Sequence, residues 1–508
     1  TTGGSVSMPT NWFFVGRNNG DGTLNVSGNG SISALRLWVG GATYGDNGTG
    51  TVNIDTTGAI LGTDGIMLGS AWAGGTASGT VNLTNGTLTS GNELWVGAEG
   101  GTGSSTATFN QYGGAVSSAA WLVVGRGNNS IGTYNLFGGT VTAATSAFGS
   151  VANSQGTLNV SGGSFLVAAS NRMYVGEGGT GTLNVSGTGT VTCSNIPDGG
   201  IRLGVNSGAV GTVNLNGGTL RAALISQGSG SGTFNFNGGT LKAVAGNTNF
   251  MQGLDAANVL TGGAVIDTAG NSITIAQALL DGDGLNGGLT KTGNGTLTLN
   301  GVNTYTGSTI VNAGTLAGTG TIAGALTNSA TLAPGDGGIG SLTLNGNLTL
   351  NAGSTNVFDV DGTTPANESV IAGANVTYGG SLRIVPSGTL TAGQTFTLFS
   401  GAGAVNPGNF ASVQSANPAV TFSFTNGVLT VVSAINPNPP QMQVSVSGST
   451  MTLAWPTNAG WILQQQTNSL SAGLGTNWVD VSGSANITST NITINPAAPT
   501  VFFRLKLP

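Results

Sequence analysis

The residues of this sequence that could do chemistry are two close pairs of aspartates. Asp281 and Asp283 flank Gly282. Asp359 and Asp361 flank a valine, and Gly362 follows them. Carboxylates that alternate around a glycine turn can hold a weakly bound Ca²⁺, but neither pair brings the further carboxylates of a complete calcium loop. Aspartate also forms turns without any ligand. We interpret both pairs as turn residues, with calcium binding as the alternative, and we expect no dedicated metal or cofactor site.

Catalysis would require more reactive side chains than these pairs supply. An enzyme that cleaves polysaccharides needs paired carboxylates for acid and base work, or clustered basic residues that neutralise an acidic sugar. The 508 residues contain no His, and their 11 Lys and Arg and 17 Asp and Glu are spread along the chain. We therefore expect the protein not to be an enzyme. The net charge of −6 argues against a nucleic-acid partner, and no apolar run reaches the ~20 residues of a membrane-spanning helix.

A repeated asparagine is the most regular polar feature of the chain. The phrase Gly-Thr-Leu-Asn at 22–25 returns in varied form, and its asparagines are Asn25, Asn53, Asn82, Asn110, Asn135, Asn159, Asn184, Asn214 and Asn235. Their mean spacing of about 26 residues is typical of one coil of a solenoid. Because each lies beside a glycine corner, the repeat predicts a ladder of side-chain amides along the stack, or a set of turn caps, and not a binding site.

Each repeat must position these residues with three short strands. Runs that alternate apolar and polar residues, such as 93–97, 107–112 and 115–117, are separated by glycine-rich turns. Side chains two residues apart point to the same face of a strand, so Leu94 and Val96 face inward together. Stacked coils would bury one continuous aliphatic column. The sequence thus predicts an all-β fold, a parallel β-solenoid (β-helix) with three strands per coil, followed by a small C-terminal β-sandwich.

A second row of side chains points outward between the inward pairs of the first run. Its members are Phe14, Trp38, Met67, Trp95, Val123, Ala147, Tyr174, Arg202 and Ser226. Large apolar side chains on a surface usually mark an interface. We therefore name Trp12, Phe14, Trp38, Trp95 and Tyr174 as a candidate interface. Three interpretations remain open: an inert ladder stabilised by stacking, a protein contact, and a platform for a surface glycan.

Changes in pattern along the chain give the expected domain organisation. Its six parts are an N-terminal extension (1–11), regular coils (12–245), a transition coil (246–284), a continued solenoid (285–433), a Pro-rich linker (434–440) and a β-sandwich of six or seven strands (441–508). The single cysteine, Cys193, excludes a disulfide framework, so packing and hydrogen bonds must stabilise the fold.

Two segments resemble known families. Residues 285–316, with the motifs Leu289-Thr290-Lys291-Thr292-Gly293 and Asn303-Thr304-Tyr305-Thr306-Gly307, closely resemble the passenger-associated repeat of bacterial autotransporters. That resemblance implies an extracellular β-helix. Autotransporters end in a membrane barrel for which residues 441–508 are too few, so we expect a chain cut free of a barrel or exported in another way. The strings Thr467-Asn468-Ser469-Leu470, Asn477-Trp478 and Phe502-Phe503-Arg504 resemble C-terminal modules of secreted proteins of environmental bacteria, which again implies export.

These features lead to two functional hypotheses. A solenoid ends in two exposed strand edges, and Asn11-Trp12-Phe13-Phe14-Val15 enters the first coil without a charged cap. Pairing of such ends between copies does not close on itself and builds a filament. The first hypothesis is therefore a secreted bacterial structural protein whose subunits form a homopolymer, an extracellular fibre or sheath in a biofilm matrix or on the cell surface. The alternative is a monomeric adhesin or glycan-binding passenger on the cell surface.

Overall fold

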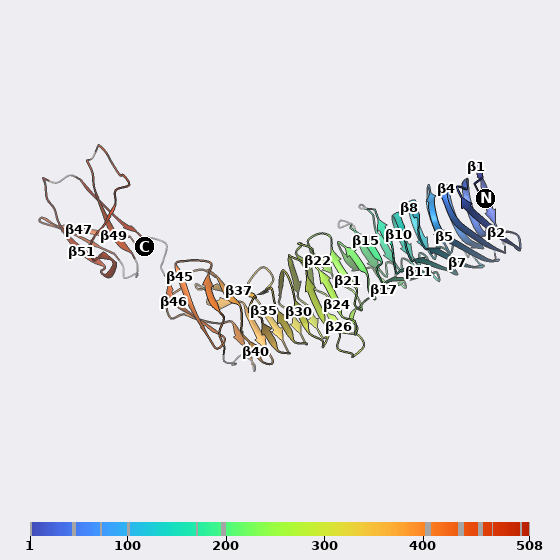
Figure 1. The fold of residues 1–508 in the computed structure, drawn as a ribbon. Helices are drawn as coiled ribbons and strands as arrows, with labels where there is room; N and C mark the ends of the chain where they lie inside the picture. Colours follow the sequence, from blue (N-terminus) through green and yellow to red (C-terminus); the bar gives the residue numbers. More distant parts are fainter. Residues whose placement is uncertain are drawn as a thin grey trace. The chain divides into compact units, whose positions relative to one another are not determined.

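The computed structural model of the protein consists of strands that stack coil upon coil, followed by smaller antiparallel sheets (Figure 1). It describes residues 3–42, 47–71, 74–98, 102–168, 171–194, 200–401, 408–434, 441–455, 461–469, 471–497 and 500–506. Two compact units divide the chain. The first comprises Thr1–Val357, Glu368–Ser381 and Phe399–Ala411, and the second comprises Phe358–Asn367, Leu382–Leu398 and Ser412–Pro508.

The first unit is a parallel β-solenoid of about 15 turns with three strands per coil. Its strands form three ladders, which we call A, B and C. Some strands bend around a corner and therefore belong to two or three ladders. These are β1 (Ser5–Val15), β3 (Ser31–Ala42), β4 (Gly48–Ala71), β5 (Thr76–Ser90), β8 (Ala115–Val124) and β10 (Thr140–Phe148). This arrangement confirms the predicted fold class.

Ladder A follows the first run of each repeat. Besides β1, β3, β4, β8 and β10 it contains β6 (Glu93–Val96), β13 (Met173–Val175), β16 (Ile201–Leu203), β19 (Ile225–Gln227), β22 (Asn247–Met251), β25 (Ile273–Ile275), β28 (Thr296–Leu299), β31 (Thr315–Gly318), β34 (Thr331–Pro334) and β37 (Thr355–Asp361).

Ladder B follows the asparagine phrase. Besides β4 and β5 it contains β2 (Gly20–Gly28), β7 (Ser104–Gln111), β9 (Ser130–Leu136), β11 (Gln155–Val160), β14 (Thr180–Val185), β17 (Val210–Leu215), β20 (Ser231–Phe236), β23 (Ala256–Val259) and β26 (Leu279–Asp281). Further along the chain, a separate parallel sheet contains β29 (Val302–Asn303), β32 (Thr321–Ile322), β35 (Ser341–Leu344), β39 (Ser369–Ala372) and β43 (Phe399–Ser400).

Ladder C follows the third run. Besides β1, β3, β4, β5, β8 and β10 it contains β12 (Ser164–Val167), β15 (Thr190–Cys193), β18 (Thr219–Ala222), β21 (Thr240–Ala243), β24 (Ala264–Asp267), β27 (Leu289–Thr292), β30 (Thr309–Val311), β33 (Leu326–Asn328), β36 (Leu348–Leu350) and β40 (Val376–Thr377).

The core is the aliphatic column between the three ladders. Leu94 and Val96 of ladder A, Val81 of ladder B and Leu88 of ladder C are all 0% exposed, as the alternation predicts. Glycine makes the corners between ladders possible. At Gly125, for example, φ is +73° and an added Cβ would lie 2.3 Å from the carbonyl oxygen of Gln155 in the next coil, so a side chain there is excluded.

The first coil begins earlier than the sequence analysis expects. Strand β1 starts at Ser5, and Ser5 to Met8 pair in register with Ser31 to Ala34 of β3, so residues 5–11 are part of the coil and not an extension. The register shifts between Met8 and Trp12, which leaves residues 9–11 as an irregularity at the corner between ladders C and A.

Antiparallel strands replace the coils near the C-terminal end of the expected solenoid. The second unit contains β38 (Ala366–Asn367), β44 (Ser412–Ser415) and a sheet of β42 (Thr395–Thr397), β46 (Val428–Ala434) and β45 (Val420–Thr425); β41 (Ser381–Ser387) begins at the last residue of a first-unit segment.

The described residues of the C-terminal module form six strands in two antiparallel sheets. One sheet has the order β47 (Gln443–Ser447), β48 (Thr450–Ala454), β51 (Ser489–Thr493), and the other β50 (Val479–Asp480), β49 (Ile462–Thr467), β52 (Val501–Lys506). Leu453, Trp455 and Leu463 form its core. The described residues include one short 3₁₀ helix, η1 (Ser484–Asn486), and among them no helix has the length and apolarity needed to cross a membrane.

Candidate functional site

The outward row of ladder A is partly buried, because its large side chains pack over one another. Trp38 and Met67 are each 2% exposed and form a cluster with Ala98, against which Phe14 and Trp95 pack. The expectation that Trp38 and Met67 lie on an exposed surface is therefore wrong. Strands in neighbouring coils are about 4.8 Å apart, so long side chains on successive strands cover each other along the stack. Trp12 is the most exposed of the five candidate interface residues, at 38%.

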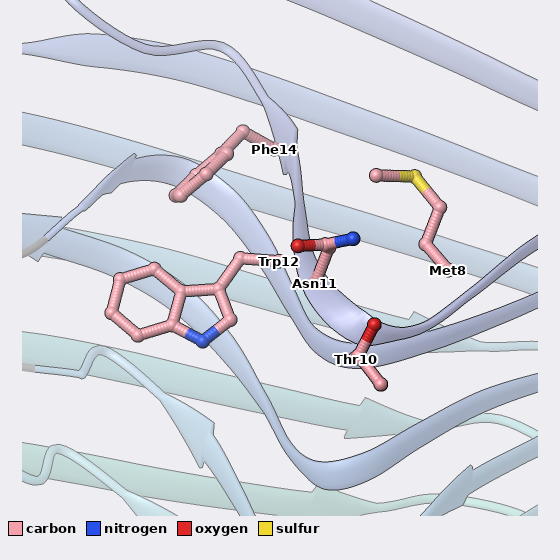
Figure 2. A pocket seen from close by; sticks show the side chains of 5 residues that line it. All are labelled: Met8, Thr10, Asn11, Trp12 and Phe14. Carbon is pink, nitrogen blue, oxygen red and sulfur yellow. The ribbon is translucent and has the colours of Figure 1, made fainter.

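Trp12 and Phe14 border a hollow at the start of the solenoid. Met8, Thr10, Asn11, Trp12 and Phe14 line an open space of about 520 Å³, and Figure 2 shows Trp12 and Phe14 extending from the same side of β1. The ring of Trp12 lies 6.0 Å from that of Phe14 and 5.8 Å from that of Trp38. The irregularity at residues 9–11 places Thr10 and Asn11 between the aromatic rings and Met8, which gives the hollow polar and apolar walls.

Two arginines lie over these aromatic rings. The Arg17 guanidinium is 4.5 Å from the centre of the Phe14 ring, and the Arg36 guanidinium is 5.9 Å from that of Trp12. Arg36 also donates a 2.7 Å hydrogen bond from Nε to Asp64. A cation that lies over the face of an aromatic ring is attracted to it electrostatically. Two of the residues that line the hollow, Trp12 and Phe14, are therefore each in contact with an arginine.

Within the described residues, the aliphatic column is only partly covered at the first coil. Val6, Phe13 and Leu24 point inward but are half-buried, whereas their partners in the next coil, Ile32, Leu37 and Val52, are at most 1% exposed. Within the described part of the chain, β1 pairs only with β3 and β2 only with β4. The first coil thus presents unpaired strand edges and uncovered apolar side chains together.

Tyr174 belongs to a different group of side chains. Its ring lies 5.9 Å from Trp121, and its hydroxyl accepts a 3.0 Å hydrogen bond from Arg172. Trp95, nearer the first coil, donates from Nε1 to Glu93 at 2.5 Å and lies 5.1 Å below the Arg126 guanidinium. Sequence reasoning missed Trp121, since it lies one residue before the alternating run. The candidate interface residues therefore fall into two groups, one at the first coils and one around Tyr174.

The asparagine side chains on the strands of ladder B form the predicted row of hydrogen-bonded amides. Each asparagine donates from Nδ2 to Oδ1 of the asparagine one coil earlier, at 2.7 to 2.9 Å, from Asn53 to Asn235. Asn258 extends it by one coil, donating to Asn235 at 2.8 Å. The sequence analysis missed Asn258 because its phrase, Ala256-Ala257-Asn258, lacks the Gly-Thr signal. These contacts support the structural interpretation of the asparagines.

Lys291 is a buried cation that connects three coils. It is 0% exposed, and its Nζ donates to Thr268 Oγ1 (2.9 Å) and to the carbonyl oxygens of Thr292 (2.9 Å), Gly293 (2.7 Å) and Ala313 (2.9 Å). These four acceptors follow β24, β27 and β30, three successive strands of ladder C. Burial lowers the pKa of Lys291 to about 8, and the nearby Asp267 carboxylate opposes this shift. The ammonium therefore remains charged at neutral pH.

Asn303 and Tyr305 are buried in the same region. Asn303 donates to the carbonyls of Gly301 (3.0 Å) and Thr321 (2.9 Å) and accepts from the Leu279 amide (3.0 Å), so it too spans three coils. The Tyr305 hydroxyl lies 2.6 Å from Thr309 Oγ1, and burial raises the pKa of Tyr305. Lys291 and Asn303 thus bind neighbouring coils together inside the structure, whereas the hydroxyl contact of Tyr305 stays within its own coil.

Asp283 lies in the turn after β26, and Asp361 ends β37 directly before a turn, whereas Asp281 is the last residue of β26 and Asp359 lies within β37. Asp283 accepts hydrogen bonds from the amides of Thr261 (2.8 Å) and Leu285 (3.1 Å), and Asp361 accepts one from Thr363 (2.8 Å). Burial raises the pKa of Asp359. Within the described ranges, no three His, Cys, Asp or Glu residues gather closely enough to hold a metal ion. These hydrogen bonds from main-chain amides support the turn interpretation for Asp283 and Asp361, whereas for Asp359 it is wrong, because this residue lies inside β37.

One segment of the chain matches a known protein family. Residues 289–317 match the family model of the passenger-associated-transport-repeat. No curated protein matches the chain. The matched segment runs from β27 to β31 and includes the buried side chains of Lys291, Asn303 and Tyr305, of which Lys291 and Asn303 connect neighbouring coils. The matched repeat and the β-solenoid around it together fit a repeat protein of the autotransporter passenger type.

Proposed function

We propose that this protein is a secreted structural protein whose copies join head to tail into an extracellular fibre or sheath. The observation that carries the proposal is the open first coil, where unpaired edges of β1 and β2 meet the half-buried Phe13 and Leu24. Exposed strand edges recruit further strands, and natural proteins usually protect them with charge or a covering segment. The passenger-associated repeat indicates a secreted or surface-exposed protein, which is where such a fibre would form.

The geometry of the open end favours a polymer over a closed pair. A parallel coil has two different ends, so a contact that continues the stack joins unlike surfaces. Contacts between unlike surfaces generate filaments when they do not close into a ring. The proposal assigns the protein a mechanical role, with no catalytic residue and no cofactor.

Electron microscopy with one matched pair of variants tests this function. We expect the wild-type protein to form uniform fibres in negative stain. Leu24→Lys places a charge on the uncovered end of the column and should leave folded single particles, whereas Thr23→Lys, on the outward face of the same strand, should still give fibres. Single rods from the wild-type protein at every concentration would contradict the proposal.

A monomeric adhesin that binds surface glycans is a second candidate. The hollow beside Trp12 supports it, because aromatic rings with nearby polar groups suit the apolar and hydroxyl faces of a sugar. An adhesin predicts glycan binding by the wild-type protein that is lost in Trp12→Ala. Glycan binding that survives this substitution would exclude the hollow as the binding site, and fibres without any glycan binding would remove the candidate.

A further inference from the structure

Strand β47 of the C-terminal module is an edge strand whose apolar side chains are uncovered. It pairs with β48, and within the described residues no strand pairs with its other edge. All five of its residues are exposed, including Val444 at 57% and Val446 at 60%. Val444 lies opposite Leu453, which is 1% exposed, and Val446 lies opposite Met451, which packs on the same core.

The inner face of the module is therefore incomplete at β47. Residues directly opposite each other in an antiparallel pair point to the same face of the sheet. Val444 and Val446 consequently face the side on which Leu453 is buried, yet the second sheet of the module leaves them exposed. No charged residue or proline occurs in Gln443–Ser447, so the edge lacks the usual protection against pairing.

The sequence of β47 has the pattern of a ladder C strand. Val444-Ser445-Val446 alternates apolar and polar residues as do Ile32-Ser33-Ala34 of β3 and Val141-Thr142-Ala143 of β10. In β1 the same pattern is Val6-Ser7-Met8, and these residues pair with β3 on one side only. Val6 and Met8 are half-buried, whereas Ile32 and Ala34, which stack between two strands, are at most 1% exposed.

From this match we infer that β47 of a second copy adds to β1 as a further strand of ladder C, parallel and in register. Val444 would cover Val6, and Val446 would cover Met8. The second copy thereby continues the coil-to-coil interface that runs through the whole solenoid, and main-chain pairing satisfies the open amides and carbonyls of both edges. This inference rests on the proposed head-to-tail assembly and names the segment that makes the joint.

Disulfide trapping tests the register. The one natural cysteine, Cys193, is buried, so crosslinks should form only between the introduced cysteines. Ser7 and Ser445 are exposed and would lie on neighbouring strands, at a separation that a disulfide spans. Mixing the Ser7→Cys protein with the Ser445→Cys protein should give a crosslinked pair. Ser489→Cys, on the opposite edge strand β51, should not crosslink to Ser7→Cys.

Edge charges test the effect on assembly. Val444→Lys with Val446→Lys should abolish fibres without lowering the melting temperature, because both side chains are exposed in the single copy. Val479→Lys, at another exposed valine (62%) on β50, should leave the fibres unchanged. Fibres of wild-type appearance from the double variant would overturn the role of β47 while leaving the assembly itself established.

Binding of a peptide tests the contact between β47 and β1 independently of fibre formation. A labelled peptide of residues 441–449 should bind the full-length Val444→Lys/Val446→Lys protein at least tenfold more tightly than the same peptide with both lysines, measured by fluorescence anisotropy. Equal binding of the two peptides would overturn the inference, whether or not the wild type forms fibres. Disulfide-linked dimers of Ser445→Cys with itself, in place of the mixed pair, would assign β47 to self-pairing and overturn it as well.

Discussion

At the scale of single residues, Lys291 shows why a charged side chain occurs inside an aliphatic solenoid. A lysine ammonium has three N–H donors, and here they meet four oxygens from three coils. Main-chain carbonyls that turn inward at the corners need donors, and a buried carbonyl without one costs about 1–3 kcal/mol. Lys291 thus supplies hydrogen bonds that stacked coils cannot supply by strand pairing.

Replacing this lysine by an apolar side chain of similar length tests its role. Lys291→Met should lower the free energy of unfolding by about 2–4 kcal/mol, because it removes the donors to several buried oxygens at once. Lys242→Met is the control: Lys242 makes a 2.6 Å ion pair with Asp267 at a partly exposed site, so its loss should cost at most about 1 kcal/mol. Equal denaturant midpoints for the two variants would show that Lys291 does not connect the coils.

The lowered pKa of Lys291 predicts a pH dependence of stability. In the unfolded chain a lysine keeps its proton up to about pH 10.4, whereas in the folded protein the pKa of Lys291 is about 8. Between these values the unfolded state binds more protons, so the contribution of Lys291 to stability should rise with pH by on the order of 1–3 kcal/mol. Denaturant titrations of wild type and Lys291→Met at pH 7, 9 and 10 measure it. A difference between the two proteins that is constant with pH would refute the shift.

At the scale of elements, the asparagine ladder makes the coils cooperative. An asparagine within the ladder, such as Asn135, makes two of its bonds, and Asn258 at its end makes one. Asn135→Ala should therefore destabilise the protein by about 1–2 kcal/mol and Asn258→Ala by about half as much. Because Asn135 and Asn159 share a bond, the double alanine variant loses three bonds and not four. Its destabilisation should be smaller than the sum of the single effects, and strict additivity would contradict the ladder.

Side chains on the outward faces of the strands follow a different rule at this scale. On the outward face of ladder A, Trp38 and Met67 bury each other although alternation points them away from the column. Trp121 and Tyr174 likewise meet from non-adjacent coils. Alternation along one strand therefore gives the direction of a side chain, and the neighbours in the next coils decide whether it reaches solvent.

At the scale of the whole molecule, stability should not depend on a bound metal ion. EDTA should leave the melting temperature and any fibres unchanged, because the carboxylates of Asp283 and Asp361 accept hydrogen bonds from main-chain amides at turns. Circular dichroism during heating, with and without EDTA, provides the measurement. A fall in melting temperature that Ca²⁺ reverses would instead favour the calcium alternative, and Asp281→Asn and Asp361→Asn would then locate the site.

The sequence alone determined the coil, because the coil is built from local and repeated signals. Alternation with a period of two directs Leu94 and Val96 inward, glycine permits the corners, and the recurring asparagine gives the register from coil to coil. The passenger-associated repeat was recognisable for the same reason, since its motif is continuous in sequence.

Only the tertiary structure decided what is covered and what is left open. The burial of Trp38, the four partners of Lys291 and the exposure of Val444 depend on residues from other coils or strands, which no pattern within one segment reveals. The same holds for the first coil: its sequence resembles the coils that follow, yet Phe13 and Leu24 are half-buried, because no other coil among the described residues stacks on them. Local periodicity gives each side chain its direction, and stacking between segments distant in sequence gives it its environment.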